Sequence, residues 1–105
     1  INWRNSLNPN FMGMLGLARR ANKVILGFDQ VSVQVPKCKL LVAACDASDR
    51  TKRNIDRLGL RVIQTDMKKV DMGKALGVGS CAVLAVTDDG FADALISRSQ
   101  TESKN

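Results

Sequence analysis

A glycine-led polar turn, residues 27–30 (Gly-Phe-Asp-Gln), follows a short apolar run and has the residue types needed to hold an anion. A chain bends sharply at glycine, and the backbone N–H groups that start the next element are then open to a phosphate. Arg20 and Lys23 come shortly before this turn, and Lys37 comes shortly after it. These features predict a site for a polyanion, and RNA is the first polyanion to consider.

The positive charge is concentrated in the first third of the chain. The 105 residues carry a formal net charge of +6, and residues 1–39 hold six basic residues against one acidic residue. A one-sided basic patch steers a protein toward nucleic acid or another anionic surface. A solvated basic face without a partner would show the same composition, so charge alone leaves both interpretations open.

Several classes of chemistry are excluded by what the sequence lacks. There is no histidine, so imidazole catalysis, Ser-His or Cys-His nucleophiles and histidine-ligated metal sites are ruled out. Cys38, Cys45 and Cys81 lie in or beside apolar runs without a C-x-x-C pair, so we expect three buried thiols in a reducing compartment. We therefore expect a cytoplasmic protein with no catalytic residue, metal, cofactor, small-molecule substrate or membrane segment.

Short motifs that often bind phosphate are better explained here by packing and capping. The GXXG at residues 13–16 matches a KH loop, but its middle residues fall on the apolar stripe of a helix. The Gly-Val-Gly at residues 77–79 precedes a strand, and the Gly-Lys at residues 73–74 lacks the upstream glycine of a P-loop. Asp46 and Ser48 are rival N-caps of one helix, and the acidic pair at residues 88–89 caps another.

The elements that must position the turn alternate between helices and short apolar strands. The sequence predicts a helix that begins at residue 9, helices over 49–58 and 71–76, a last helix after residue 89, and strands over 24–26, 39–45, 61–65 and 81–86. Residues 31–35 alternate like a strand, whereas the crossover to the next strand favours a helix, and Pro36 ends the element in either case. We predict one α/β domain over residues 1–105, a three-layer α/β/α sandwich of about four strands with a core over 9–97 and a polar tail over 98–105.

Four segments follow one another in a specific order: the glycine turn at 27–30, the strand at 39–45 with Asp-Ala-Ser at 46–48, DMGKALG at 71–77 and the strand at 82–87. This order resembles the ribosomal protein L-seven-Ae and L-thirty-e family. LGLARRANK at 15–23, CDAS with its charged helix at 45–58 and AVTDDGFADAL at 85–95 resemble its bacterial YlxQ-like branch. Each segment is weak alone, and their collective order over residues 11–96 is the specific feature. The resemblance implies a small mixed sheet and the binding of RNA kink-turns or related internal loops.

The resemblance also implies which residues would read the RNA. Family members read sheared G·A pairs with a Gly-x-Asn-Glu-x-x-Lys motif, whose glycine is matched by Gly27. Asp29, Gln30 and Val33 stand at its Asn, Glu and Lys positions. Ionised Asp29 accepts but cannot donate, Gln30 lacks the charge of a carboxylate, and Val33 supplies no cation. The implied RNA surface is therefore retained with a changed base-reading motif.

The chain is thus predicted to bind structured RNA without catalysis, with ribosomal RNA as one candidate, and to be a monomer outside a ribonucleoprotein. The alternative is a protein-interaction module in ribosome assembly whose basic face is incidental. The predicted RNA contacts comprise phosphate-binding cations, the glycine turn and two loops. They are Arg20, Lys23, Lys37, Lys39 and Lys52 for phosphates, Gly27, Phe28, Asp29 and Gln30 in the turn, and Ser48, Val78, Gly79 and Ser80 in the loops.

Overall fold

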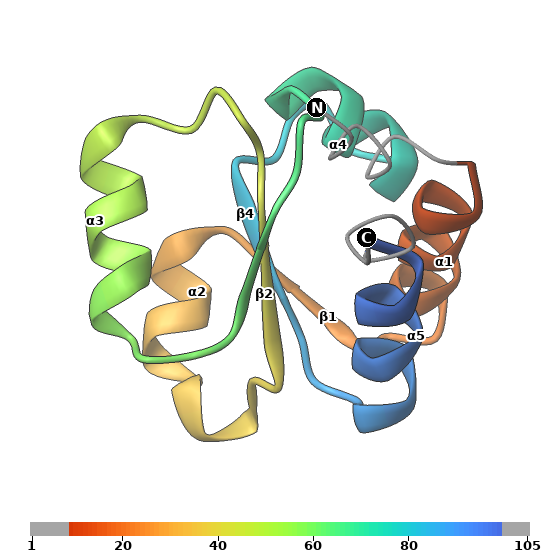
Figure 1. Ribbon diagram of the computed structural model, residues 1–105, viewed down its shortest axis with the longest axis horizontal. Coiled ribbons are helices and arrows are strands. Elements are labelled where there is room, and N and C mark those ends of the chain that lie inside the picture. The colour runs from red at the N-terminus through yellow and green to blue at the C-terminus, as the bar shows by residue number, and fades with distance from the viewer. Residues whose placement is uncertain (1–8, 100–105) are drawn as a thin grey trace, which may run out of the picture.

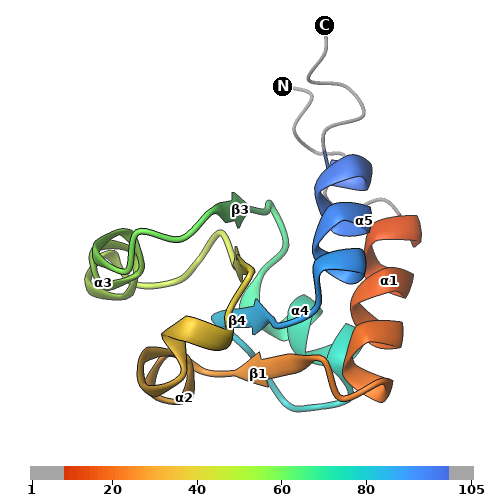
Figure 2. The same cartoon turned by 90° about the horizontal axis from the view of Figure 1, so that it is seen from below.

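The computed structural model describes residues 9–99, which form a four-stranded sheet between two helical layers (Figure 1). The elements in chain order are α1 (Pro9–Arg20), β1 (Val24–Leu26), α2 (Phe28–Val33), the 3-10 helix η2 (Val35–Lys37), β2 (Leu40–Ala43), α3 (Asp49–Arg57), β3 (Val62–Gln64), α4 (Lys69–Leu76), β4 (Val83–Val86) and α5 (Asp89–Ser99). Helices α1, α4 and α5 cover one face of the sheet, and α2 and α3 cover the other (Figure 1, Figure 2). The predicted α/β/α sandwich is confirmed.

The sheet is mixed, and its strands are ordered β1-β4-β2-β3. Strand β4 is antiparallel to both β1 and β2, whereas β2 and β3 are parallel. All residues of β2 and β4 are buried, because helices cover both faces of these two inner strands. The ends of β1, β2 and β3 therefore lie at the same edge of the sheet as the start of β4.

Alternation along the strands sends side chains into two separate cores. Val24, Leu40, Val42, Leu84 and Val86 pack with Phe11, Leu15, Met72 and Leu95 from the helices of one layer. Leu41, Ala43, Val83 and Ala85 pack with Val31 of α2 and Ile55 of α3 in the other layer. Each fully buried Leu, Ile or Phe side chain contributes about 1.5–3 kcal/mol relative to an exposed one. The sheet is thereby held rigidly between its two layers.

The ambiguous residues 31–35 are helical at their start. Val31 packs on the sheet and Val33 is exposed, so the alternating valines belong to a short crossover helix. The expected stop at Pro36 is wrong in detail, because α2 ends at Val33 and the proline lies inside η2. Proline fits there because it occupies the start of that 3-10 helix, where no intrahelical N–H bond is lost.

Three further expectations need correction or stand outside the structure. Cys45 is exposed rather than buried, because it follows β2 beyond the helical layers. Helix α4 begins two residues earlier than expected, at Lys69, and α5 runs through Arg98 into the predicted tail. Residues 100–105 of that tail lie outside the described residues. Among the described helices, none has the length and apolar character needed to cross a membrane.

Candidate nucleic-acid interface

Three backbone segments meet at one edge of the sheet, which we call the loop edge: residues 27–30, 45–48 and 77–80. Gly27 N donates to Val83 O at 3.0 Å, so the glycine turn is tied to the start of β4. Ala44 N donates to Ala82 O at 2.8 Å, which ties the chain leaving β2 to the same point. The sheet register therefore brings together the predicted contact residues of these three segments.

The turn at Gly27 opens the start of α2. Gly27 has φ 87° and ψ 143°, a backbone conformation that side chains other than glycine rarely adopt. The first backbone bond of the helix runs from Val31 N to Gly27 O at 3.1 Å, and no side chain caps this end. Within the described residues, the N–H groups of Phe28, Asp29 and Gln30 have no acceptor. They present three donors and the positive end of the helix dipole at the loop edge.

Loop 77–80 lies directly on helix α4 because Gly73 has no side chain. A Cβ at Gly73 would stand 2.6 Å from Ser80 Cα and 2.7 Å from Gly79 O, closer than atoms approach one another. Val78 N donates to Gly73 O at 2.8 Å, and Gly77 ends the helix in the left-handed conformation. Val78 is half-buried, whereas Gly79 and Ser80 are exposed.

Gly73 is a site residue that the sequence did not reveal. The sequence offers its Gly-Lys pair as an incomplete P-loop, whereas the missing side chain of Gly73 lets the loop approach the helix. The available signal was a glycine inside a helix, which is unfavourable by about 1 kcal/mol relative to alanine. Spacing alone could not show which backbone segment takes the place of the missing side chain.

The rival caps Asp46 and Ser48 serve two different helices. Ser48 Oγ accepts from Thr51 N at 3.1 Å and so caps α3. Asp46 Oδ1 accepts from Lys69 N at 2.8 Å and caps α4, whose own N-cap residue supplies no side-chain bond. Lys52 Nζ donates to Cys45 O at 3.2 Å, so this ammonium group is held against segment 45–48. The loop thereby fixes the starts of both helices relative to one another.

Two lysines at the loop edge were not among the predicted contacts. Lys68 and Lys69 are exposed at the start of α4, next to the Asp46 cap. Cys81 N also donates to Lys69 O at 3.0 Å, which places this helix start beside the end of loop 77–80. Their position after β3, whose end shares an edge with the end of β2, was the signal that could have identified them.

A buried thiol lies beneath the loop edge. Cys81 Sγ donates to Val83 O at 3.3 Å. Burial raises the pKa of the Cys81 thiol, and hydrogen bonds with the backbone of Val83 and Gly27 lower it by less. The neutral thiol therefore acts as a small packing group between the glycine turn and β4.

The predicted phosphate contacts Arg20, Lys23, Lys37 and Lys39 lie at the opposite end of the strands. Lys23 O accepts from Thr87 N at 2.9 Å, and Lys39 N donates to Val86 O at 2.8 Å, so both lysines flank the end of β4. The expected single site with Gly27 is not what the structure shows. Lys23 precedes strand β1 and Gly27 follows it, so the two residues lie at opposite ends of this strand.

Comparisons with known proteins agree with this fold. No protein-family model matches the sequence. The RNA-binding protein YlxQ of Bacillus subtilis (strain 168) is 37% identical over 91 residues, which cover 80% of this chain and 89% of the relative. A solved structure of a protein of unknown function from Bacillus halodurans has a TM-score of 0.77 at 27% identity, over 86% of this chain and 96% of that chain.

A more distant structure shares the fold. The 15.5kD RNA binding protein of Giardia lamblia has a TM-score of 0.70 at 15% identity, and the match covers 98% of this chain and 91% of that chain. At this identity the likeness concerns the fold, whereas the 37% identity to the B. subtilis relative extends along most of both sequences. The chain therefore belongs to the YlxQ branch of the L-seven-Ae and L-thirty-e family.

Proposed function

We propose that this chain is a cytoplasmic, non-enzymatic protein that binds structured RNA with the loop edge, as a monomer outside its ribonucleoprotein. The observation that carries the proposal is the convergence of three segments, 27–30, 45–48 and 77–80, around the start of β4. The B. subtilis and G. lamblia relatives are named RNA-binding proteins, which supports RNA as the ligand.

Each segment offers a different kind of contact. The open N–H groups at the start of α2 suit a phosphate, because a helix N-terminus favours negative charge. Lys52, Lys68 and Lys69 add cations along the same edge. The half-buried Val78, on a loop held against α4, offers an apolar cover for an unstacked base. Together these groups suit an RNA internal loop flanked by helices better than a continuous duplex.

The three base-reading positions hold side chains that differ from those of the family motif, although all three are exposed. Asp29, Gln30 and Val33 are all exposed, and Val33 is 73% exposed, so packing does not dictate their identity. Each good bidentate base contact that is missing weakens discrimination by about 1–3 kcal/mol. We therefore propose that the chain binds kink-turn or related internal-loop RNA chiefly through backbone and shape, with weak selection for sheared G·A pairs.

A titration with a short kink-turn RNA tests this proposal. We expect binding at about 50 mM salt that weakens steeply toward about 200 mM, because phosphate contacts release counterions. Amide NMR signals of residues 27–30, 45–48 and 77–80 should shift on binding. An absence of binding at low salt would contradict the proposal, and capture of a protein partner by a variant that binds no RNA would favour the protein-interaction alternative.

A Gly27→Val variant provides a sharper test at the glycine turn. Its backbone conformation is unfavourable for a β-branched residue, so the start of α2 must change. We expect the free energy of RNA binding to weaken by more than the free energy of unfolding falls. Gly13→Ala is a matched control, because a Cβ at Gly13 meets nothing within 4 Å.

A further inference from the structure

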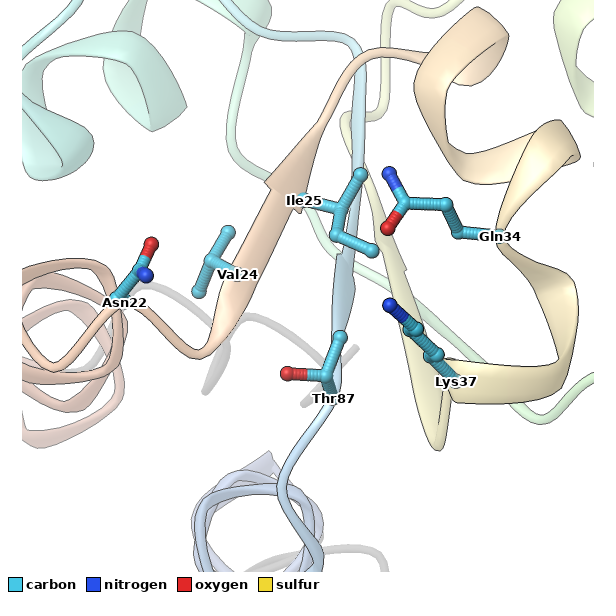
Figure 3. A pocket seen from close by; sticks show the side chains of 6 residues that line it. All are labelled: Asn22, Val24, Ile25, Gln34, Lys37 and Thr87. Carbon is cyan, nitrogen blue, oxygen red and sulfur yellow. The ribbon is translucent and has the colours of Figure 1, made fainter.

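A polar pocket opens at the end of the strands opposite the loop edge (Figure 3). It has a volume of about 430 Å³ and is lined by Asn22, Val24, Ile25, Gln34, Lys37 and Thr87. The amides, the ammonium group and the hydroxyl in this lining can all donate hydrogen bonds, and no lining residue is acidic. In Figure 3 the Gln34 amide and the Lys37 ammonium group point toward β1 from the opposite wall. This donor set suits an anion with several oxygen atoms.

Backbone hydrogen bonds hold the walls of the pocket in place. Asn22 ends α1 in the left-handed conformation with φ 63°, and Lys23 N donates to Ala18 O at 2.9 Å across this cap. Thr87 is tied to Lys23 through its N–H at 2.9 Å. On the other wall, Cys38 Sγ donates to Gln34 O at 3.3 Å. The main chain that carries the donor side chains is therefore fixed on both walls of the pocket.

Exposed cations lie at the same end of the strands as the pocket, and we call this region the lysine edge: Arg20, Lys23, Lys37 and Lys39 with the pocket itself. Neighbouring strands lie about 4.8 Å apart, so Lys23 and Lys39 stand roughly 10 Å apart on either side of the end of β4. Within residues 9–99, none of these four cations is paired with a carboxylate. Their full charge is available to a ligand.

The nearest carboxylate in sequence is already engaged. Asp88 follows Thr87, and its Oδ2 accepts from Phe91 N at 2.9 Å, which caps α5. The exposed Asp89 begins α5 and is the other acidic residue that directly follows the end of β4 in the sequence. Four cations against these two acidic residues leave the lysine edge positive.

We propose that the lysine edge is a second RNA-contacting surface, in which the pocket takes a backbone phosphate of an RNA segment distinct from the one at the loop edge. The proposal rests on RNA being the ligand of the loop edge. Three of the four cations are lysines, which are depleted at protein interfaces but serve well as point charges for phosphate. The chemistry therefore favours nucleic-acid backbone over a protein partner.

The separation of the two edges determines which RNA can reach both. Thr87, in the wall of the pocket, is four strand residues beyond Val83, whose carbonyl accepts from Gly27 N, so it lies about 13 Å from the glycine turn. An RNA with short stems that fills the loop edge ends before the lysine edge. A longer stem, or a second segment of the same RNA, extends to it.

The test compares three RNAs that share one internal loop. One has short stems, and each of the others has a different stem extended by one helical turn. We expect at least one longer RNA to bind the wild-type chain more tightly and with a steeper salt dependence. Combined Lys23→Gln, Lys37→Gln and Lys39→Gln substitutions should reduce that slope by about 2–3, at about 0.9 for each phosphate contact, and leave the short RNA unaffected.

Controls separate this inference from the proposed function. Arg53→Gln removes an exposed cation from the middle of α3 that belongs to neither the loop edge nor the lysine edge, and should change neither slope. If the short RNA binds but the triple variant binds every RNA as the wild type does, the lysine edge is not an RNA surface. If the short RNA fails to bind, the proposed function fails instead.

Amide NMR identifies the occupant directly. Side-chain signals of Asn22 and Gln34 should shift with the longer RNA and not with the short one. Polyglutamate, added at equal charge, should leave these signals in place. A stronger response to polyglutamate than to RNA would overturn the proposal in favour of an acidic protein partner.

Discussion

The two ends of the central strand β4 carry surfaces of opposite construction. At its start, the loop edge presents backbone donors and closely approaching glycines, with Asp29 and Asp46 among its side chains. At its end, the lysine edge presents side-chain cations around a polar pocket. Under the two proposals, the loop edge docks RNA chiefly by shape, with Lys52, Lys68 and Lys69 as its cations, and the lysine edge attracts RNA chiefly by charge.

Among the predictions that test the difference between the two edges, we expect the largest effect from Gly73→Ala. The added Cβ would collide with the backbone of residues 79–80 and push loop 77–80 off α4. We expect RNA affinity at the loop edge to fall roughly 100-fold, or about 2.7 kcal/mol, and stability to fall by about 1–3 kcal/mol from overpacking. Binding titrations and urea unfolding measure the two losses.

Gly13→Ala is the matched control for this variant. It lies in an exposed position of α1 where a Cβ meets open space, so it should stabilise the helix by up to about 1 kcal/mol without changing RNA binding. Unchanged RNA affinity in Gly73→Ala would mean that loop 77–80 does not contact RNA. The loop edge would then lose one of its three segments.

Restoring the base-reading motif should raise the affinity and selectivity of the loop edge for kink-turn RNA. Asp29→Asn, Gln30→Glu and Val33→Lys together return the family's donor, carboxylate and cation on exposed positions, with little effect on stability. We expect affinity for a kink-turn RNA to rise roughly 30-fold, because one good bidentate contact contributes about 1–3 kcal/mol. An RNA whose sheared G·A pairs are replaced by Watson–Crick pairs is the control and should gain less. Equal gains for both RNAs would show that these positions do not read bases.

Thiol reactivity distinguishes the edges without any substitution. Cys45 is exposed in the loop edge, whereas Cys38 and Cys81 are buried. At a free RNA concentration about ten times Kd, alkylation of Cys45 should slow roughly tenfold, because only the unbound fraction reacts. Mass spectrometry of the alkylated protein measures this rate. Cys45 that reacts equally fast with and without RNA would place the RNA elsewhere.

The smallest effect concerns the two buried thiols, Cys81 beneath the loop edge and Cys38 beneath the lysine edge. Burial raises the pKa of each thiol above 9.0, so the folded state keeps the proton that the unfolded state releases first. Their contribution to stability is full below about pH 9 and declines above it, by at most about 1.4 kcal/mol per pH unit for each thiol.

Urea unfolding at about pH 7, 9 and 10 follows this decline, with the pH values chosen around the ordinary thiol pKa. Cys81→Ala and Cys38→Ala should each remove part of the loss at high pH. If neither variant alters the pH dependence, the two thiols are not its cause.

The sequence predicted the fold more completely than the site. The apolar runs at 24–26, 39–45 and 81–86 and the caps between them were sufficient for the layers, because burial on both faces leaves a continuous apolar pattern. Residues 31–35 stayed ambiguous because three valines that alternate with polar residues have the same local pattern in a short helix as in a strand. The packing of Val31 on the sheet decides between them.

The grouping of the site was less predictable, for a geometric reason. Lys23 and Gly27 are four residues apart, yet one lies at each edge because β1 is extended between them. Gly73 and Ser80, by contrast, meet in space through a turn whose path the spacing does not reveal. Cys45 is exposed because the chain leaves the core two residues after the end of β2, where Ala44 is still buried.

The hydrogen bonds on both sides of β4 have a mechanical consequence. β4 pairs with β2 over its full length and with β1 over residues 84–86, and its residues are buried on both faces, so it cannot slide or bend on its own. The distance between the two ends of β4 is therefore constant. An RNA that occupies both ends must fit one fixed spacing, and a spacer of another length must be strained or leave one end empty.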